Sequence, residues 1–374
     1  MKILLLAHIE PTGGTGTYYK RVISFLLSQG HEVVPVLKHE DLIVSANTDT
    51  FPDLEYHTYS KHYKLDYFFY RCFRKVNLLN FYLLFRDRIL IRHHVKVIKP
   101  DFIFISQGGG FEYFGALSTH LPTLCIIHSL FTKSKEDLYF KALKKLEKIF
   151  KFNSNKAIIH VSNNANDLYN KFSPFKNFKT IVIPNYADPF NESKTIHETL
   201  NIFTAGHLQG WKNPILWAEC ALSLCQKYKH VNFYWAGSGH LYDEVYNLVK
   251  NCDQIHLLGF ITNMPDYYKI ADIYFQPSIS ESQGIAVINA LAAGIPCVVS
   301  NVGGLPDSIT NKLEGFLCNP TDKTGFINSL SILIEDEELR KLMGANGKRK
   351  YNLLFTQQQW TKSMEAAFNS VLLN

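Results

Sequence analysis

The residues best suited to chemistry lie in a polar segment, 277–284, which holds one carboxylate, Glu281. Small and apolar residues follow from 285 to 293, a pattern that predicts a helix starting just after this segment. Free backbone amides at a helix start bind anions such as phosphate. Glu281 is suited to accept hydrogen bonds from a polyol, or to serve only as an acid at the helix N-terminus. The segment therefore predicts contacts with phosphate and hydroxyl groups, with the purely structural role as the alternative.

A second segment, 205–214, holds the cation Lys212 two residues before Pro214. Proline is favoured in the first turn of a helix, so this pattern predicts a helix start beside the lysine. A cation together with the positive end of a helix suits a diphosphate. The alternative is an ordinary solvated lysine.

A third segment is the glycine-rich stretch around Gly14 and Gly16, which follows the first apolar run of the chain. Glycine amides at a helix start can hold an anion. The dinucleotide fingerprint lacks its third glycine, because Tyr19 stands at that position. The stretch predicts either a contact with an anionic ligand or a flexible turn.

Short apolar runs alternate with helical patterns along the whole chain, which predicts βαβ units and parallel sheets. The predicted strands are 3–7, 33–37, 101–106, 123–128, 157–161, 180–183, 202–205, 231–236, 255–258, 273–276 and 297–300. The predicted helices are 16–29, 135–152, 213–227, 240–250, 265–270, 285–293 and a last one from about 358. In such sheets ligands bind where strands end and helices begin, which is where the three segments fall.

The chain has 374 residues and a mass of 42.9 kDa, a length that favours two domains. Hydrophobic residues make up 46%, so the chain can bury real cores. No apolar run reaches the roughly 18–20 residues needed to cross a bilayer. The seven cysteines include no C-x-x-C pair, which argues against a disulfide framework or a structural zinc site. We therefore expect reduced thiols and a cytoplasmic protein.

Charge is distributed unevenly, with a net +10 over residues 1–184 and −4 over residues 185–374. Segment 56–99 carries ten basic residues, two acidic residues and eleven Phe or Tyr. Basic, aromatic-rich segments suit an anionic membrane surface. They also suit single-stranded nucleic acid, or form ordinary helices with solvated basic faces. We expect peripheral membrane contact and no nucleic-acid binding, and expect neutralisation of Arg71, Arg74 and Lys75 to abolish vesicle binding.

Around Glu281 the pattern becomes specific, because seven residues separate it from Asn289 and a small-residue helix and an apolar strand follow. With the pattern from Gly206 to Lys212 and the Gly303-Gly304 pair, the chain resembles glycosyltransferase family 4, retaining enzymes of the GT-B architecture. The resemblance is strong over 201–320 and moderate over 1–190, with nothing recognisable in 40–100.

The resemblance implies an α/β fold of two Rossmann-like domains whose parallel sheets face a central cleft. It implies an acceptor-binding domain over 1–184, a nucleotide-sugar-binding domain over 185–357, and a helix over 358–374 that crosses back to the first domain. The reaction would move a sugar, as in a hexosyltransferase, from a nucleotide-diphosphate donor to a glycan or polyprenyl-diphosphate-linked acceptor in polysaccharide biosynthesis. We expect no cofactor and no metal, and a location in the cytoplasm or at the inner face of the membrane.

The resemblance also implies a role for each site residue. Glu281, Lys212 and His128 would be catalytic, the first at the donor sugar, the second at the departing diphosphate and the third near the acceptor. The implied donor-binding set is Gly14, Gly16, His207, Lys212, Gly237, Phe260, Glu281, Gln283, Gly284, Ile285 and Asn289.

Two positions depart from the family pattern. Asn289 replaces a glutamate that meets the ribose, so its hydrogen bond carries no charge and should be weaker. His207 replaces an arginine, and a histidine is not a permanent cation. One alternative is therefore a catalytically degenerate partner subunit of another glycosyltransferase. A sugar-nucleotide epimerase and a nicotinamide-dependent enzyme also remain open.

Overall fold

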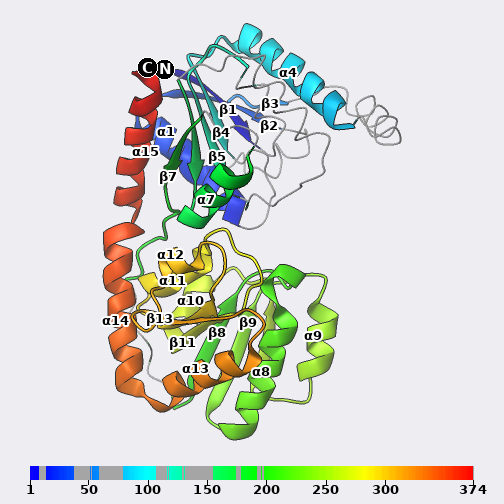
Figure 1. The fold of residues 1–374 in the computed structure, drawn as a ribbon, viewed down its shortest axis with the longest axis vertical. Helices are drawn as coiled ribbons and strands as arrows, with labels where there is room; N and C mark the ends of the chain where they lie inside the picture. Colours follow the sequence, from blue (N-terminus) through cyan, green and yellow to red (C-terminus); the bar gives the residue numbers. More distant parts are fainter. Residues whose placement is uncertain are drawn as a thin grey trace. The chain divides into compact units, whose positions relative to one another are not determined.

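The computed structural model describes residues 1–7, 14–37, 51, 53–58, 79–106, 116, 118–128, 130, 155–173, 178–191, 195 and 198–373. These residues form two compact units (Figure 1). Unit 1 comprises Met1–Val161, Ala165–Ile183 and Thr361–Asn374, and unit 2 comprises Ser162–Asn164 and Pro184–Trp360. The predicted helix 135–152 and the segment 59–78 lie outside the described residues.

Unit 1 is built on a parallel sheet with the strand order β3-β2-β1-β4-β5-β6-β7 in its described part. Its strands are β1 (Lys2–Ala7), β2 (Glu32–Leu37), β3 (His57–Thr58), β4 (Phe102–Ser106), β5 (Thr123–Ile127), β6 (Lys156–His160) and β7 (Lys179–Val182). Its helices are α1 (Gly14–Ser28), α4 (Leu79–Ile98), α7 (Asn163–Phe172) and α15 (Gln357–Leu372).

Helices cover both faces of this sheet. Successive side chains of β4 point to opposite faces, so neighbouring residues of this strand pack against different helices. Ile103 packs in one apolar cluster with Ile91 of α4. On the other side, the ring of Phe368 from α15 stacks on Phe102 and Phe104, with ring centroids 4.6 and 5.8 Å apart. As the spacing of its apolar residues predicts, α15 buries one stripe, formed by Trp360, Met364, Ala367 and Val371.

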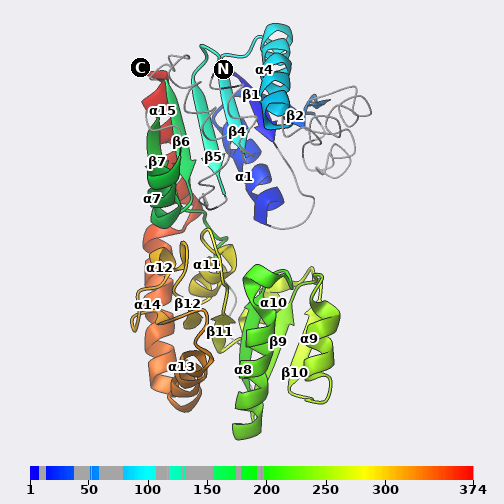
Figure 2. The same cartoon turned by 45° about the vertical axis from the view of Figure 1, so that its right-hand side comes forward.

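Unit 2 repeats the plan with a parallel sheet of order β10-β9-β8-β11-β12-β13 (Figure 2). Its strands are β8 (Leu200–Ala205), β9 (Val231–Ala236), β10 (Ile255–Gly259), β11 (Ile273–Gln276), β12 (Cys297–Ser300) and β13 (Gly315–Cys318). Its helical elements are η1 (Gly210–Lys212), α8 (Pro214–Lys227), α9 (Tyr242–Val249), α10 (Met264–Ile270), α11 (Ile285–Ala292), α12 (Leu305–Ser308), α13 (Lys323–Glu335) and α14 (Glu337–Leu354). Helices α8, α9 and α13 share one apolar cluster and α10 and α11 another, so both faces are covered.

The fold class expected from the sequence is therefore confirmed, with local differences. Helix α1 already begins at Gly14, so the predicted turn at Gly14 and Gly16 is the first turn of the helix. Strands β3 and β13 and helices α7, α12, α13 and α14 were not predicted, and α4 lies in the segment where ordinary helices were one alternative. In α14 two glycines interrupt the helical pattern, and the packing explains them: a Cβ on Gly344 would lie 2.1 Å from the carbonyl oxygen of Gly294. Tertiary packing here overrides the poor helix propensity of glycine.

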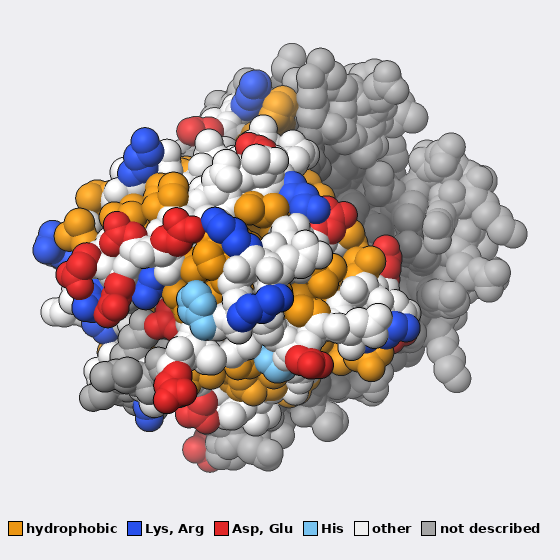
Figure 3. All heavy atoms as spheres, turned by 90° about the horizontal axis from the view of Figure 1, so that it is seen from below, with side chains coloured by type: hydrophobic (Ala, Val, Ile, Leu, Met, Phe, Trp, Pro, Cys, Tyr) orange, Lys and Arg blue, Asp and Glu red, His pale blue; other side chains and the backbone are white. Residues whose placement is uncertain are grey.

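Two further features bear on function. Within the described residues, no helix is long and apolar enough to cross a membrane, and no group of three or more His, Cys, Asp or Glu side chains is placed to hold a metal ion. Figure 3 shows acidic and basic side chains interspersed over one face of unit 2.

Candidate functional site

The centre of the candidate site is an ion pair in unit 2 between the Lys212 ammonium and Oε2 of Glu281. Lys212 ends η1, which follows β8, and Glu281 follows β11, the strand paired with β8. The two side chains are 14% and 13% exposed. In such partly dry surroundings a charge-assisted hydrogen bond is stronger than at an open surface. The fold thus joins the first two segments singled out in the sequence.

The loops that carry this ion pair are tied together by their backbones. The carbonyl of Trp211 accepts hydrogen bonds from the amides of Ile279 and Ser280, at 2.8 and 3.3 Å. On the other side, Gly303 lies against Glu281, where an added Cβ would come within 1.7 Å of the Glu281 carbonyl oxygen. Gly303 also has φ +54°, a conformation that glycine adopts without strain. The position of Glu281 therefore depends on the glycine loop after β12.

Glycines also bring the loops after β8, β9 and β10 together. A Cβ on Gly237 would lie 2.0 Å from the carbonyl oxygen of Gly206, so a side chain there would force the two loops apart. The Gly237 amide donates to the carbonyl of Gly259 at 2.7 Å. The aliphatic part of Lys212 runs over Gly206, with Cε 3.2 Å from where a Cβ would be. The absence of side chains thus creates the space that Lys212 occupies.

Helix α11 begins beside the ion pair at Ile285, with Gly284 at its N-cap in a left-handed conformation, φ +87°. Within the described residues the backbone amides of Gln283 and Gly284 donate to no acceptor. The Gln283 side chain is buried, and its Oε1 accepts from the backbone and side-chain amides of Asn185 at 2.7 and 2.6 Å. Its backbone amide, rather than its side chain, is therefore the group that can meet an anion.

Asn289 lies one turn into α11, next to the hydroxyl of Tyr268. That hydroxyl donates to the carbonyl of Ala286 at 3.1 Å. Burial raises the pKa of Tyr268, which keeps the hydroxyl protonated, while the neighbouring Asn289 amide acts in the opposite direction. The role of Asn289 at the donor stays a prediction.

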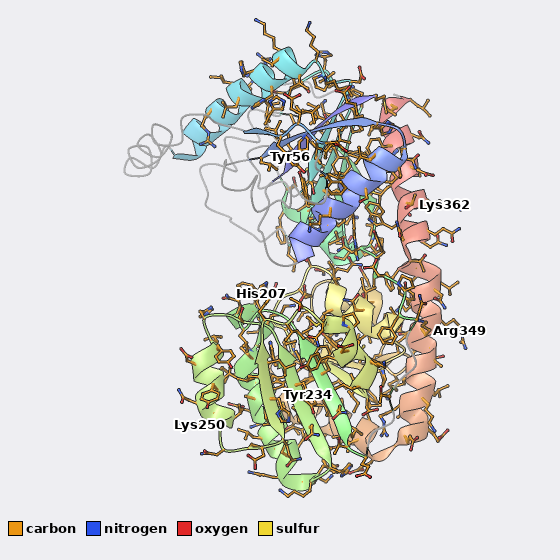
Figure 4. All side chains as sticks on the ribbon, turned by 180° about the vertical axis from the view of Figure 1, so that it is seen from behind. Tyr56, His207, Tyr234, Lys250, Arg349 and Lys362 are labelled. Carbon is orange, nitrogen blue, oxygen red and sulfur yellow. The ribbon has the colours of Figure 1, made fainter. Side chains whose placement is uncertain are left out.

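His207 and Phe260 lie at the rim of the same cluster of loops, after β8 and β10. Figure 4 shows His207 at the carboxyl-terminal end of the unit 2 sheet. Both side chains are exposed, and the Phe260 ring is 69% exposed. Large exposed aromatic rings at the edge of a site are suited to stacking on planar ligands.

Gly14, Gly16 and His128 belong to unit 1. His128 directly follows β5, and its ring meets the ring of Tyr18, one turn into α1, with centroids 4.3 Å apart. Burial lowers the pKa of His128 to about 4. Its Nε2 is buried with no hydrogen-bond partner among the described residues. Unit 1 therefore brings a neutral imidazole close to the glycine-rich start of α1, and the functional roles of these three residues stay predictions.

Two residues of the site escaped the sequence analysis. Gln276, the last residue of β11, donates from Nε2 to Oε2 of Glu281 at 3.0 Å. Tyr268 of α10 lies next to Asn289 and donates to the carbonyl of Ala286 in α11. The signal for Gln276 was a polar residue inside an otherwise apolar strand, a position that demands a hydrogen-bond partner. Tyr268 gave no such signal, because tyrosines are ordinary residues of an amphipathic helix.

Comparison with known proteins shows which family the chain belongs to. Residues 188–350 match the model described as glycosyl transferases group 1, and residues 12–189 match the model described as glycosyltransferase family 4. The chain belongs to the GT-B glycosyltransferases. Together the two matches span residues 12–350, which include every candidate site residue named above.

Relatives and solved structures agree with this assignment. The chain is 27% identical over 248 residues to an Escherichia coli enzyme named UDP-Gal:alpha-D-GlcNAc-diphosphoundecaprenol alpha-1,3-galactosyltransferase; the alignment covers 60% of this chain and 64%, less than two thirds, of the relative. A glycosyltransferase structure from Rickettsia africae matches with a TM-score of 0.79 at 16% identity, covering 100% and 99% of the two chains. HepE of Anabaena in complex with UDP matches with a TM-score of 0.78 at 15% identity, covering 99% and 100%. At these identities the structures establish the fold alone.

Proposed function

We propose that this glycosyltransferase moves a sugar, with retention of configuration, from a UDP-sugar to a glycan or polyprenyl-diphosphate-linked acceptor in polysaccharide biosynthesis. The observation that carries the proposal is the Lys212–Glu281 pair beside the open amides at the start of α11. It combines, within one unit, groups suited to a diphosphate and groups suited to sugar hydroxyls.

The chemistry follows from these groups. Breaking the bond between the sugar and the diphosphate passes through an oxocarbenium-like state, while negative charge grows on the leaving phosphate oxygen. The Lys212 ammonium and the amides of Gln283 and Gly284 are fixed donors that can meet this charge. Glu281 accepts hydrogen bonds from sugar hydroxyls. In the proposed step the acceptor oxygen bonds to the anomeric carbon on the face that the phosphate leaves, and its proton passes to the phosphate oxygen.

The choice of UDP and of a lipid-linked acceptor is supported by likeness. HepE has been solved with UDP and with UDP-glucose, and the name of the E. coli relative specifies a UDP-sugar and a diphosphoundecaprenol acceptor. We extend both to this chain as proposals. The expectation that the reaction needs no metal is a prediction of the same kind, and activity that persists in EDTA would support it.

A thermal-shift screen with UDP, GDP, ADP, CMP and NADH in metal-free buffer tests the donor site. A ligand at about 100 times its dissociation constant stabilises the native state by roughly 2.7 kcal/mol. We expect UDP to raise the melting temperature of the wild type and Lys212→Ala to reduce that rise. A folded protein that responds to none of these compounds would favour the alternative of a catalytically degenerate partner. Product analysis then tests retention, which an inverted anomer or a sugar covalently attached to the protein would contradict.

Helix α4 supports the proposed contact with a membrane. Ile89, Arg92, His93, Lys96 and Val97 are exposed and follow a spacing of three and four residues, so they share one face of the helix. From residue 88 to 99 the sequence contains no Asp or Glu. Exposed aliphatic side chains among cations suit an anionic lipid surface. The three residues Arg71, Arg74 and Lys75 lie outside the described residues.

Sedimentation with vesicles tests this contact. Each Lys or Arg near an anionic surface contributes about 1 kcal/mol, so the double change Arg92→Gln, Lys96→Gln should weaken binding to phosphatidylserine vesicles by roughly tenfold to thirtyfold. The matched control is Lys227→Gln, Lys341→Gln in unit 2, which removes the same charge from exposed positions. Equal vesicle binding by all three proteins would contradict a role for α4.

A further inference from the structure

A chain of buried hydrogen bonds lies under the Lys212–Glu281 pair. Tyr274 and Gln276 are two residues apart on β11, so their side chains point to the same face of the sheet. Both are almost completely buried, at 0% and 1% exposure. The Tyr274 hydroxyl lies 2.8 Å from Oε1 of Gln276, and Nε2 of Gln276 lies 3.0 Å from Oε2 of Glu281. Gln276, a buried polar residue of a strand, thus has a hydrogen-bond partner on each side.

The chemistry of these partners fixes the orientation of the Gln276 amide. An ionised carboxylate only accepts hydrogen bonds, so the amide must present its nitrogen to Glu281. Its oxygen then faces the hydroxyl of Tyr274, which donates to it. Burial raises the pKa of Tyr274, so this hydroxyl keeps its proton. Nε2 has a second proton, which Ser278 accepts on Oγ at 3.1 Å. Each polar group of the amide therefore has a partner.

Lys212 and Gln276 donate to the same oxygen of Glu281. In the proposed reaction, on which this inference rests, the Lys212 ammonium serves the departing diphosphate. The neutral Gln276 amide stays beside Glu281 when Lys212 binds the diphosphate, because hydrogen bonds to Tyr274 and Ser278 hold the amide in place. We infer that Gln276 is a positioning residue that holds the Glu281 carboxylate toward the donor sugar while Lys212 binds the diphosphate.

Calorimetric titration with UDP and with UDP-glucose or UDP-galactose separates this role from general damage. Gln276→Met keeps the length of the side chain and removes the amide. We expect about tenfold weaker binding of the UDP-sugar and a tenfold lower kcat/KM, with the affinity for UDP unchanged, because UDP lacks the sugar that Glu281 contacts. In a Glu281→Ala background the same change should alter UDP-sugar binding less than twofold, since the residue through which Gln276 acts is gone.

Thr204→Val is the matched control. Thr204 is equally buried and donates to the carbonyl of Phe275 at 2.6 Å, so it differs from Gln276 in bonding to the backbone and not to Glu281. It should leave both affinities at wild-type values. If Gln276→Met fails to fold, Tyr274→Phe removes only the anchor of the amide and should weaken UDP-sugar binding by a smaller factor, again without an effect on UDP.

The outcomes separate this inference from the proposed function. Unchanged UDP-sugar affinity in Gln276→Met, with UDP binding intact, overturns the role of Gln276 alone. An equal loss in the wild-type and Glu281→Ala backgrounds also overturns it, because the effect would not pass through Glu281. A wild-type protein that binds neither UDP nor the UDP-sugars overturns the proposed donor site itself.

Discussion

The centre and the rim of the loop cluster in unit 2 hold their candidate residues in different ways. At the centre, Lys212 and Glu281 pair with each other, and Gln276 gives the carboxylate a second hydrogen bond. At the rim, His207 and Phe260 are exposed, and within the described residues neither side chain makes a hydrogen bond, an ion pair or a ring contact. One region is prearranged by its neighbours, and the other is free to adapt.

This difference separates two kinds of contribution to a reaction. Fixed charges and dipoles stabilise developing charge without reorganising, so they act on the rate of the chemical step. Exposed side chains must be ordered when a ligand arrives, and the entropy lost offsets part of what the contact gains. We therefore expect changes at the centre to lower kcat and changes at the rim to alter mainly donor affinity.

The largest effect should come from Lys212→Ala. It removes the cation of the ion pair beside the start of α11 and leaves the Glu281 carboxylate without its charged partner. Loss of one preorganised charge donor costs about 10²–10³-fold in kcat. Steady-state kinetics with a UDP-sugar that the wild type uses as donor would measure this effect. Lys227→Ala, which breaks an exposed ion pair with Glu335 in the same unit, is the control. Equal kcat values for the two variants would show that Lys212 is an ordinary surface lysine.

Gly303→Ala should displace Glu281 by moving the backbone of the loop that packs against it. The new methyl group would lie 1.7 Å from the Glu281 carbonyl oxygen at a residue with positive φ, so the loop must move. We expect the free energy of unfolding to fall by about 2–4 kcal/mol and activity to fall with it. Gly30→Ala is the matched control, because its φ is also positive, +73°, but no atom lies within 4 Å of the added group. Chemical denaturation that gives both variants the same stability would contradict the steric argument.

Most strands, and the clustering of the site loops in unit 2, could be predicted because each apolar run of four to six residues ends at glycines or polar residues. In a parallel sheet those ends share one edge, so Lys212 and Glu281 were expected there together. Strand β13 and helix α14 could not be predicted in this way. Gly344 lowers helix propensity locally and is explained only by contact with Gly294, 50 residues earlier. The periodicity of apolar residues shows which secondary structure a segment prefers. It does not show which residues that segment needs in order to pack against a distant segment.

The same limit applies to the supporting residues of the site. A sequence shows that Gln276 is polar in an apolar strand, and its partners Tyr274, Ser278 and Glu281 lie within five residues of it, but only the path of the strand and the following loop brings these side chains together. Likewise, the hydrogen bond from the Tyr268 hydroxyl to the carbonyl of Ala286 joins α10 to α11, and neither helix alone reveals it. The resemblance to a family indicated the residues that face the ligand, whereas the residues that hold them emerged only with the structure.

At the rim, Phe260→Ala should have a smaller effect than changes at the centre. If the exposed ring stacks on the uracil base, its loss removes about 1–3 kcal/mol of stacking, or roughly fivefold to 150-fold in UDP affinity, with little change in kcat. Inorganic pyrophosphate has no base, so its binding should be unchanged. Tyr246→Ala, which removes a half-exposed ring from α9, controls for general loss of surface aromatics. Weaker binding of pyrophosphate and UDP alike would place Phe260 in a structural role.

The smallest effect is expected from His207→Arg, which gives the rim a permanent cation. An exposed ion pair is worth about 0.2–1 kcal/mol, so UDP should bind roughly twofold to fivefold more tightly. High salt should reduce the gain, since exposed charges are screened. His230→Arg, an exposed change just before β9 at the opposite end of the sheet, controls for net charge. A gain of the same size in that variant would mean that long-range attraction, rather than contact at the rim, accounts for the tighter binding.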